Sequence, residues 1–204
     1  MTNTELSKNY WRYYLMLEKK YLETVEYVEI HTDNYHSFSN EFAMLLQAIG
    51  AELDNVFKVY CGYNLTDRTK NISDYATFIL TDYPGIKTQI VKVRDRDIDL
   101  IPFQNWDATR AAQSLPWWQA FDDIKHNRCG NVKEANQENV LNMLAALYLV
   151  EMKLFKKFAV TDQNGKPTEQ DGPSEDSRVF LLDGWVRRYV PFMGGMIVVD
   201  EEEN

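Results

Sequence analysis

Apolar side chains recur every three or four residues along much of the chain, which is the spacing of one face of an α-helix. The clearest case is residues 39–60, where Ser39 or Asn40 can cap a helix with a continuous apolar stripe: Phe42, Leu45, Leu46, Ile49, Leu53, Val56, Phe57 and Tyr60. The same spacing predicts four further helices, over residues 5–30, 73–83, from Pro116 onward, and 132–158. Between Val140 and Val150 apolar side chains point in nearly every direction, which predicts a central, heavily buried helix.

Other stretches lack this helical spacing. The segments TQIVKV (88–93) and IDLIPF (98–103) predict two strands joined by a charged turn, RDRD. Residues 161–177 carry no large apolar side chain and predict a flexible loop, whereas residues 178–200 have the β-branched and aromatic content of two or three strands. We therefore expect a mainly α protein with one domain over residues 1–204. Its core would be a bundle of about five helices over roughly residues 5–158, with a small β-sheet built from the middle strands and a C-terminal β appendage.

Composition and charge narrow the classes of function. The chain has 204 residues, is 45% hydrophobic and carries a net charge of −9, so RNA, DNA or nucleotide binding would require a local basic patch. The longest apolar run, MLAALYLV (143–150), is much shorter than the roughly 20 residues of a membrane span. The first residues lack the pattern of a secretory signal, and Cys61 and Cys129 are expected to be free thiols. These features predict a cytoplasmic protein that does not enter a membrane.

The densest group of chemically active residues lies in LPWWQAFDDIKHNRCGNVKEAN (115–136). On a regular helix Arg128 continues the apolar stripe of Trp117, whereas His126 lies on the opposite face beside Asp122. A guanidinium at the end of a buried stripe needs a carboxylate or helix-terminal carbonyl groups. Two glutamates that border the stripes of other helices, Glu52 and Glu151, are the expected partners of Arg128.

Two interpretations of this segment stay open. In the catalytic one, His126 acts as a general base oriented by Asp122, with Lys125 and Arg128 nearby, and Trp117 and Trp118 stack on a ligand. In the structural one, the two tryptophans fill the core, His126 is a surface residue and Arg128 is paired. Cys129, close to His126 and Arg128, is a further candidate as a reactive thiolate.

No metal or cofactor is expected from the sequence. His31, Asp33 and His36 share one loop, but no second cluster of ligating residues at a recognisable spacing completes a metal site. The glycine-rich and catalytic signatures of nucleotide-binding proteins, zinc proteases and serine hydrolases do not occur.

The stretch WWQAFDDIKHNR, followed by a long apolar helix, resembles a segment of HEPN-like helical bundles. The chain also resembles a group of uncharacterised bacterial proteins that share YVEIH, the EFAMLLQAIGAELDNVFK helix and LPWW…IKHNR, which would cover most of residues 10–158. This resemblance implies a homodimer. It also implies either a metal-independent ribonuclease of toxin–antitoxin or phage-defence systems or an inactive binding module. The family's catalytic signature is an arginine followed, a few residues later, by a histidine. No histidine follows Arg128, and His126 precedes it.

Two hypotheses follow. The favoured one is a non-catalytic, HEPN-like interaction or accessory module that binds a protein or nucleotide partner; it predicts that Arg128 is buried against a carboxylate and that no cleft gathers ionisable groups. The alternative is a ribonuclease or nucleotide-acting enzyme that uses Lys125, His126 and Arg128 at a dimer interface. It predicts that these three side chains are exposed in one groove.

Overall fold

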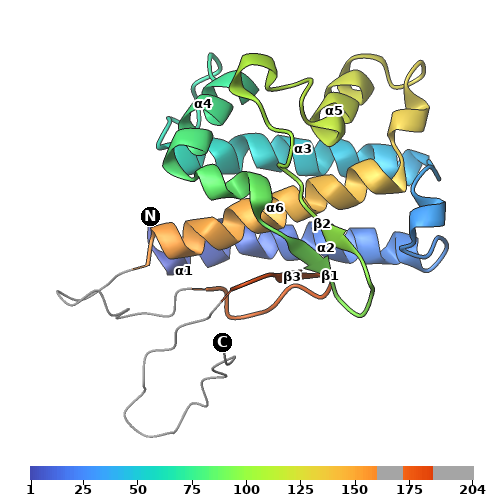
Figure 1. Ribbon diagram of the computed structural model, residues 1–204, viewed down its shortest axis with the longest axis horizontal. Helices are drawn as coiled ribbons and strands as arrows, with labels where there is room; N and C mark the ends of the chain where they lie inside the picture. The colour runs from blue at the N-terminus through green and yellow to red at the C-terminus, as the bar shows by residue number, and fades with distance from the viewer. Residues whose placement is uncertain (160–171, 186–204) are drawn as a thin grey trace, which may run out of the picture.

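The computed structural model describes residues 1–159 and 172–185 and shows the predicted helical bundle with a small antiparallel sheet (Figure 1). The N-terminal helix consists of α1 (Asn3–Leu6), a π-helical turn η1 (Ser7–Trp11) and α2 (Arg12–Val25). The other helices are α3 (Asn40–Cys61), α4 (Ile72–Asp82), α5 (Pro116–Asn127) and α6 (Gln137–Lys157). Short 3-10 turns lie between them: η2 (Thr32–Asn34), η3 (Pro84–Thr88), η4 (Ala108–Arg110) and η5 (Val132–Glu134). None of the described helices is long and apolar enough to cross a membrane.

Helix α6 forms the centre of the bundle, as its apolar pattern predicted. Every residue from Met143 to Met152 is buried. Asn136 caps the helix by accepting a hydrogen bond from the backbone N–H of Asn139. Figure 1 shows α6 crossing between α3 and the N-terminal helix, and α3 is its main packing partner. Because burial of one large aliphatic side chain stabilises a fold by roughly 1.5–3 kcal/mol, this helix is a dominant source of stability.

Aromatic rings join α3 to α5 on one side of the bundle. The ring of Phe57 on α3 stacks on Trp106 at 5.6 Å between centroids, and Trp106 lies 4.9 Å from Phe103. Phe103 meets Trp117 of α5 edge-on at 5.5 Å, and the Trp117 indole N–H donates to the carbonyl of Pro102 at 2.8 Å. The segment between the sheet and α5 is thereby held against the core.

The sheet confirms that the middle strands pair with the C-terminal part of the chain. Strand β1 (Val91–Val93) lies between β2 (Asp99–Leu100) and β3 (Phe180–Leu182), and both pairings are antiparallel. Val91 is opposite Leu100 on one side and Leu182 on the other. The strands are shorter than predicted. Residues 161–171 of the predicted loop and residues 186–200 of the predicted C-terminal strands lie outside the described part of the chain.

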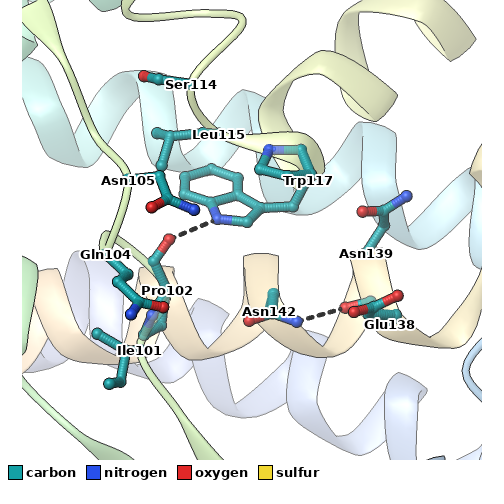
Figure 2. Close-up of a pocket in the computed structure, with 11 residues that line it drawn as sticks. Ile101, Pro102, Gln104, Asn105, Ser114, Leu115, Trp117, Glu138, Asn139 and Asn142 are labelled. Atoms are coloured by element: carbon teal, nitrogen blue, oxygen red, sulfur yellow. Dashed lines mark hydrogen bonds between the residues drawn. The ribbon is translucent and has the colours of Figure 1, made fainter.

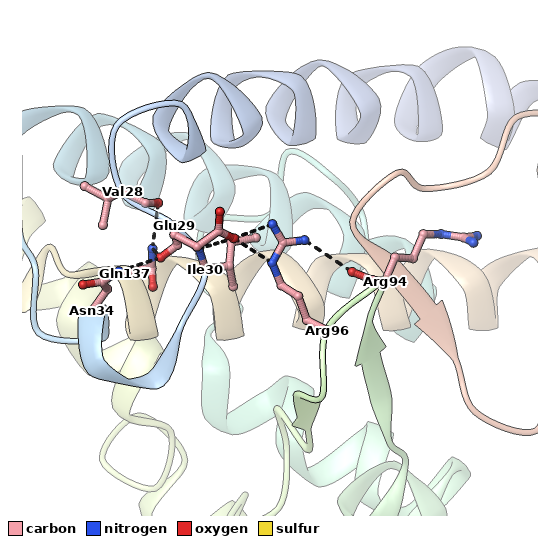
Figure 3. A network of polar contacts seen from close by, with 7 residues as sticks. All are labelled: Val28, Glu29, Ile30, Asn34, Arg94, Arg96 and Gln137. Carbon is pink, nitrogen blue, oxygen red and sulfur yellow. Dashed lines mark hydrogen bonds and ion pairs between the residues drawn. The ribbon is translucent and has the colours of Figure 1, made fainter.

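The charged turn between β1 and β2 ties three elements together (Figure 3). Arg96 donates through Nε and Nη2 to one carboxylate oxygen of Glu29, at 3.0 and 2.5 Å, and its Nη1 donates to the carbonyl of Arg94. The side-chain amide of Gln137, the first residue of α6, donates to the carbonyls of Val28 and Glu29. The loop after α2, the β1–β2 turn and the start of α6 are therefore fixed relative to one another.

A buried carboxylate anchors the segment before β3 to the N-terminal helix. Glu18 accepts hydrogen bonds from the Tyr14 hydroxyl at 2.7 Å, from the backbone N–H of Arg178 at 2.9 Å, and from the Ser177 hydroxyl. The Trp11 indole N–H donates to the carbonyl of Glu175 at 2.8 Å. These bonds position β3 beside β1.

We expect Glu18→Ala to lower the free energy of unfolding by about 3 kcal/mol, because several buried donors lose their acceptor at once. Glu26→Ala, which removes an exposed glutamate just after α2, is the matched control. Denaturant-induced unfolding of the three proteins measures the difference. A loss at Glu18 no larger than the loss at Glu26 would show that the carboxylate does not hold the C-terminal segment in place.

Candidate functional site

Helix α5 carries most of the predicted site, and its apolar stripe is buried as expected. Pro116 occupies the first turn, where a missing N–H costs nothing. Trp117, Phe121 and Ile124 pack into the bundle, and Trp118 is buried as well. The two adjacent tryptophans meet edge-on, with centroids 6.2 Å apart.

Arg128 does not continue into the core, and the predicted pairing with Glu52 or Glu151 is wrong. Its side chain is exposed, and Nη1 donates to the side-chain oxygen of Asn40 at 3.0 Å. The helical projection assumed that α5 stays buried to its end. Instead α5 ends at Asn127, and Arg128 meets the first residue of α3 at the edge of the bundle.

His126 and Asp122 are paired as the helix spacing predicted. The His126 Nε2 atom lies 3.4 Å from a carboxylate oxygen of Asp122, and both side chains are exposed. Arg128 contacts Asn40 instead, so His126 and Arg128 have different partners. Lys125, His126 and Arg128 are all exposed, and Lys125 lines a cavity together with Asp122, the partner of His126.

That cavity lies between α3, the start of α4 and α5, and we call it the α3–α4–α5 cavity. Its volume is about 850 Å³. Three residues singled out from the sequence line it: Trp118, Asp122 and Lys125. Sequence reasoning missed the other walls, which include Gly50, Asp54 and Asn55 of α3 and Lys70 before α4. The expectation that no cleft gathers ionisable groups is therefore wrong, because Asp54, Lys70, Asp122 and Lys125 all line this cavity.

Gly50 shapes the floor of the cavity. A Cβ atom at this position would lie 2.5 Å from Cδ2 of Phe121, closer than carbon atoms approach without a clash. The glycine therefore lets the Phe121 ring rest on the backbone of α3. Trp118 packs against the same ring at 5.4 Å, and only about a tenth of each aromatic residue is exposed, 8% for Trp118 and 9% for Phe121. The floor is thus a narrow aromatic surface.

Most charges around the cavity already have a partner. Asp54 binds the Lys58 ammonium group at 2.7 Å and accepts from the Tyr75 hydroxyl at 2.7 Å. Burial, and then the hydrogen bond with Asp54, raises the pKa of that hydroxyl. Lys70 lies 3.7 Å from Asp74.

Lys125 differs from these groups. Its Nζ lies 5.7 Å above the Phe121 ring, and it forms no ion pair with any described residue. The cavity therefore offers an aromatic surface and, in Lys125, a cation without an ion-pair partner among the described residues.

Trp117 belongs to a different cavity from Trp118. It lines a polar cleft between the loop after β2 and the start of α6 (Figure 2). Helix α5 thus has a separate cavity beside each of its two tryptophans.

Glu52 and Glu151 lie in the core near each other and near Tyr10. Glu151 is 0% exposed, and neither of its carboxyl oxygens has a hydrogen-bond partner among the described residues. Burial raises its pKa well above the usual value, and the charge of Glu52 adds to this effect. Burial also raises the pKa values of Glu52 and Tyr10. Full burial without a hydrogen-bond partner thus favours the protonated form of Glu151 relative to an exposed glutamate.

The remaining candidates stay apart from these cavities. His31 lies 3.4 Å from Asp33 on the surface. Cys61 is buried, which raises the pKa of its thiol to about 12, and Cys129 is exposed; both are free. Within residues 1–159 and 172–185, no group of three or more His, Cys, Asp or Glu side chains could hold a metal ion.

Comparison of this chain with protein-family models, curated proteins and solved structures finds no match. Its function is therefore inferred from its own residues.

We expect Glu151→Gln to stabilise the protein at neutral pH. The raised pKa means that the folded state holds the Glu151 proton more tightly than the unfolded chain does. This proton contributes its full stability at pH values below 4.5, the usual pKa of a glutamate. The contribution is lost as the pH rises from there through the pKa of Glu151 in the folded protein. Glutamine has no proton to lose, so the advantage of the variant grows with pH.

Unfolding by denaturant at several pH values between about 4 and 8 measures this advantage, with the exposed Glu26→Gln as the control. A difference between Glu151→Gln and the unmodified protein that does not change with pH would contradict a neutral, buried Glu151.

Proposed function

We propose that this protein is a non-catalytic, HEPN-like interaction or accessory module that binds a protein partner through the α3–α4–α5 cavity. The observation that carries the proposal is that His126 and Arg128 have different partners. Lys125 lines the cavity, His126 is paired with Asp122, and Arg128 contacts Asn40. A ribonuclease of this type would need its arginine and histidine to act on one phosphate.

The cavity suits a segment of another protein. Its floor, formed by Trp118 and Phe121 over Gly50, accepts an apolar side chain, and Lys125 can bind a carboxylate beside it. The other charged side chains that line the cavity are paired within the protein. They favour a partner whose own charges are complementary to theirs. A nucleic acid fits less well, because the net charge of −9 opposes the approach of a phosphate backbone. The homodimer, the cytoplasmic location and the bacterial defence or toxin–antitoxin context belong to the same proposal and rest on the sequence.

The second candidate is the metal-independent ribonuclease or nucleotide-acting enzyme, and one observation favours it. Asp122 lines the cavity together with Lys125 and is paired with the exposed His126, so a base and a cation occur together on one helix. In this alternative a second subunit would have to bring Arg128, or another cation, to the same phosphate.

Incubation with RNA in a metal-free buffer distinguishes the two functions. We expect no cleavage above background by the unmodified protein and the same result for His126→Ala and Arg128→Ala. His36→Ala, which changes a histidine in another loop, is the control. Cleavage by the unmodified protein that drops by about a hundredfold or more in His126→Ala, but not in His36→Ala, would establish the enzyme and reject the module.

A further inference from the structure

The polar cleft beside Trp117 is a second cavity, with a volume of about 390 Å³ (Figure 2). One wall is the first turns of α6, with Glu138, Asn139 and Asn142. The opposite wall is the loop after β2, which contributes Gln104 and Asn105, and the Trp117 indole lies between the walls. A cavity of this size matches a small ligand or a single side chain of a partner.

The α6 wall presents hydrogen-bond acceptors. The side-chain N–H₂ of Asn139 donates to the carbonyl of Glu134 at 3.0 Å, and that of Asn142 donates to the carbonyl of Glu138 at 2.9 Å. These bonds fix the amide orientations and leave the side-chain oxygens without a partner among the described residues. Asn139 is only 9% exposed, and Figure 2 shows its oxygen on the side of the amide that faces Trp117.

Two other donors in the cleft are bound within the protein, whereas the side-chain amides of Gln104 and Asn105 add neutral donors on the opposite wall. The Trp117 indole N–H is bound to the carbonyl of Pro102, and the Ser114 hydroxyl donates to the carbonyl of Ala111. Among the described residues that line the cleft, Glu138 is the one charged side chain, and no lysine, arginine or histidine is present. The cleft thus combines two oriented carbonyl oxygens, one carboxylate and an indole ring without a competing cation.

We propose that this cleft binds a guanidinium or primary ammonium group. Such a group supplies only hydrogen-bond donors, and its positive charge can pair with the Glu138 carboxylate. It is also attracted to the face of an aromatic ring. The guanidinium group fits best because its planar fork can reach several acceptors at once. An anion would meet Glu138 and two carbonyl oxygens, and a neutral ligand would leave Glu138 without a counter-charge. This site is separate from the α3–α4–α5 cavity, and its ligand has the opposite charge from the one that Lys125 attracts.

Titration of the ¹⁵N-labelled full-length protein with methylguanidinium, followed by NMR, tests the proposal. Methylurea is the matched control ligand, since it has nearly the same shape and no charge. We expect methylguanidinium to shift the side-chain signals of Asn139 and Asn142 and to bind at least about tenfold more tightly than methylurea, because charge-assisted hydrogen bonds are the stronger ones. Equal binding of the two ligands, or no shift at these signals, would overturn the proposal.

Two variants separate the cleft from the overall negative charge. Glu138→Gln should weaken methylguanidinium binding by about tenfold. Glu134→Gln, which removes the same charge from an exposed residue outside the cleft, should leave binding unchanged. Equal losses in both variants would reduce the effect to net charge and contradict a specific site. Asn142→Asp, which adds a carboxylate to the same wall, should tighten binding, and a weaker affinity would likewise contradict it.

The source of the cationic group is decided by comparing agmatine with the blocked peptide acetyl-Gly-Arg-Gly-amide. Tighter binding of the peptide assigns the cleft to an arginine side chain of a polypeptide. Tighter binding of agmatine assigns the cleft to a small free molecule that carries a guanidinium or primary ammonium group. Either result requires that binding be lost in Glu138→Gln and kept in Glu134→Gln; binding that is insensitive to Glu138 would overturn the assignment in both cases.

Discussion

Burial of α6 over its whole circumference is the constraint on which the rest of the structure depends. A helix that is apolar on all sides is stable only where neighbours cover every face, so α3 packs against one side and the N-terminal helix against another. The same burial explains the raised pKa of Glu151: its carboxyl group lies inside this packing without a hydrogen-bond partner among the described residues, where the charged form is costly.

The candidate sites arise where the packing around this core is incomplete. Helix α5 closes one side of the bundle, and its two tryptophans lie beside different cavities. Beside Trp118, the glycine at position 50 lets Phe121 approach α3, and Lys125 is the available cation. Beside Trp117, asparagine oxygens and Glu138 make the cleft attractive to a cation. One short helix therefore lies between the two cavities for which we propose ligands of opposite charge.

The sequence predicted the helices and the origin of the sheet strands well, because these depend on local periodicity. It also predicted the Asp122–His126 contact, which follows from helical spacing alone. The prediction that Arg128 is buried was wrong. A helical projection shows which face of the helix a residue lies on, but it does not show how far the neighbouring helices cover that face. The partners of α5 in the cavities come from α3, the loop after β2 and α6, and no local pattern brings them together. Gly50 offered one signal, since an isolated glycine in a strongly periodic helix indicates a close approach by a neighbour.

The proposed function rests on recognition of a polypeptide through the α3–α4–α5 cavity. Selection of a displayed random-peptide library on the full-length protein tests it most directly, with Ala51→Trp to fill the cavity and Met44→Trp, at an exposed position on the same helix, as the matched control. We expect the selected peptides to carry an apolar residue next to a carboxylate and to bind the unmodified protein and Met44→Trp but not Ala51→Trp. Peptides that bind Ala51→Trp as well as they bind Met44→Trp, or a selection that yields no binding peptide, would contradict it.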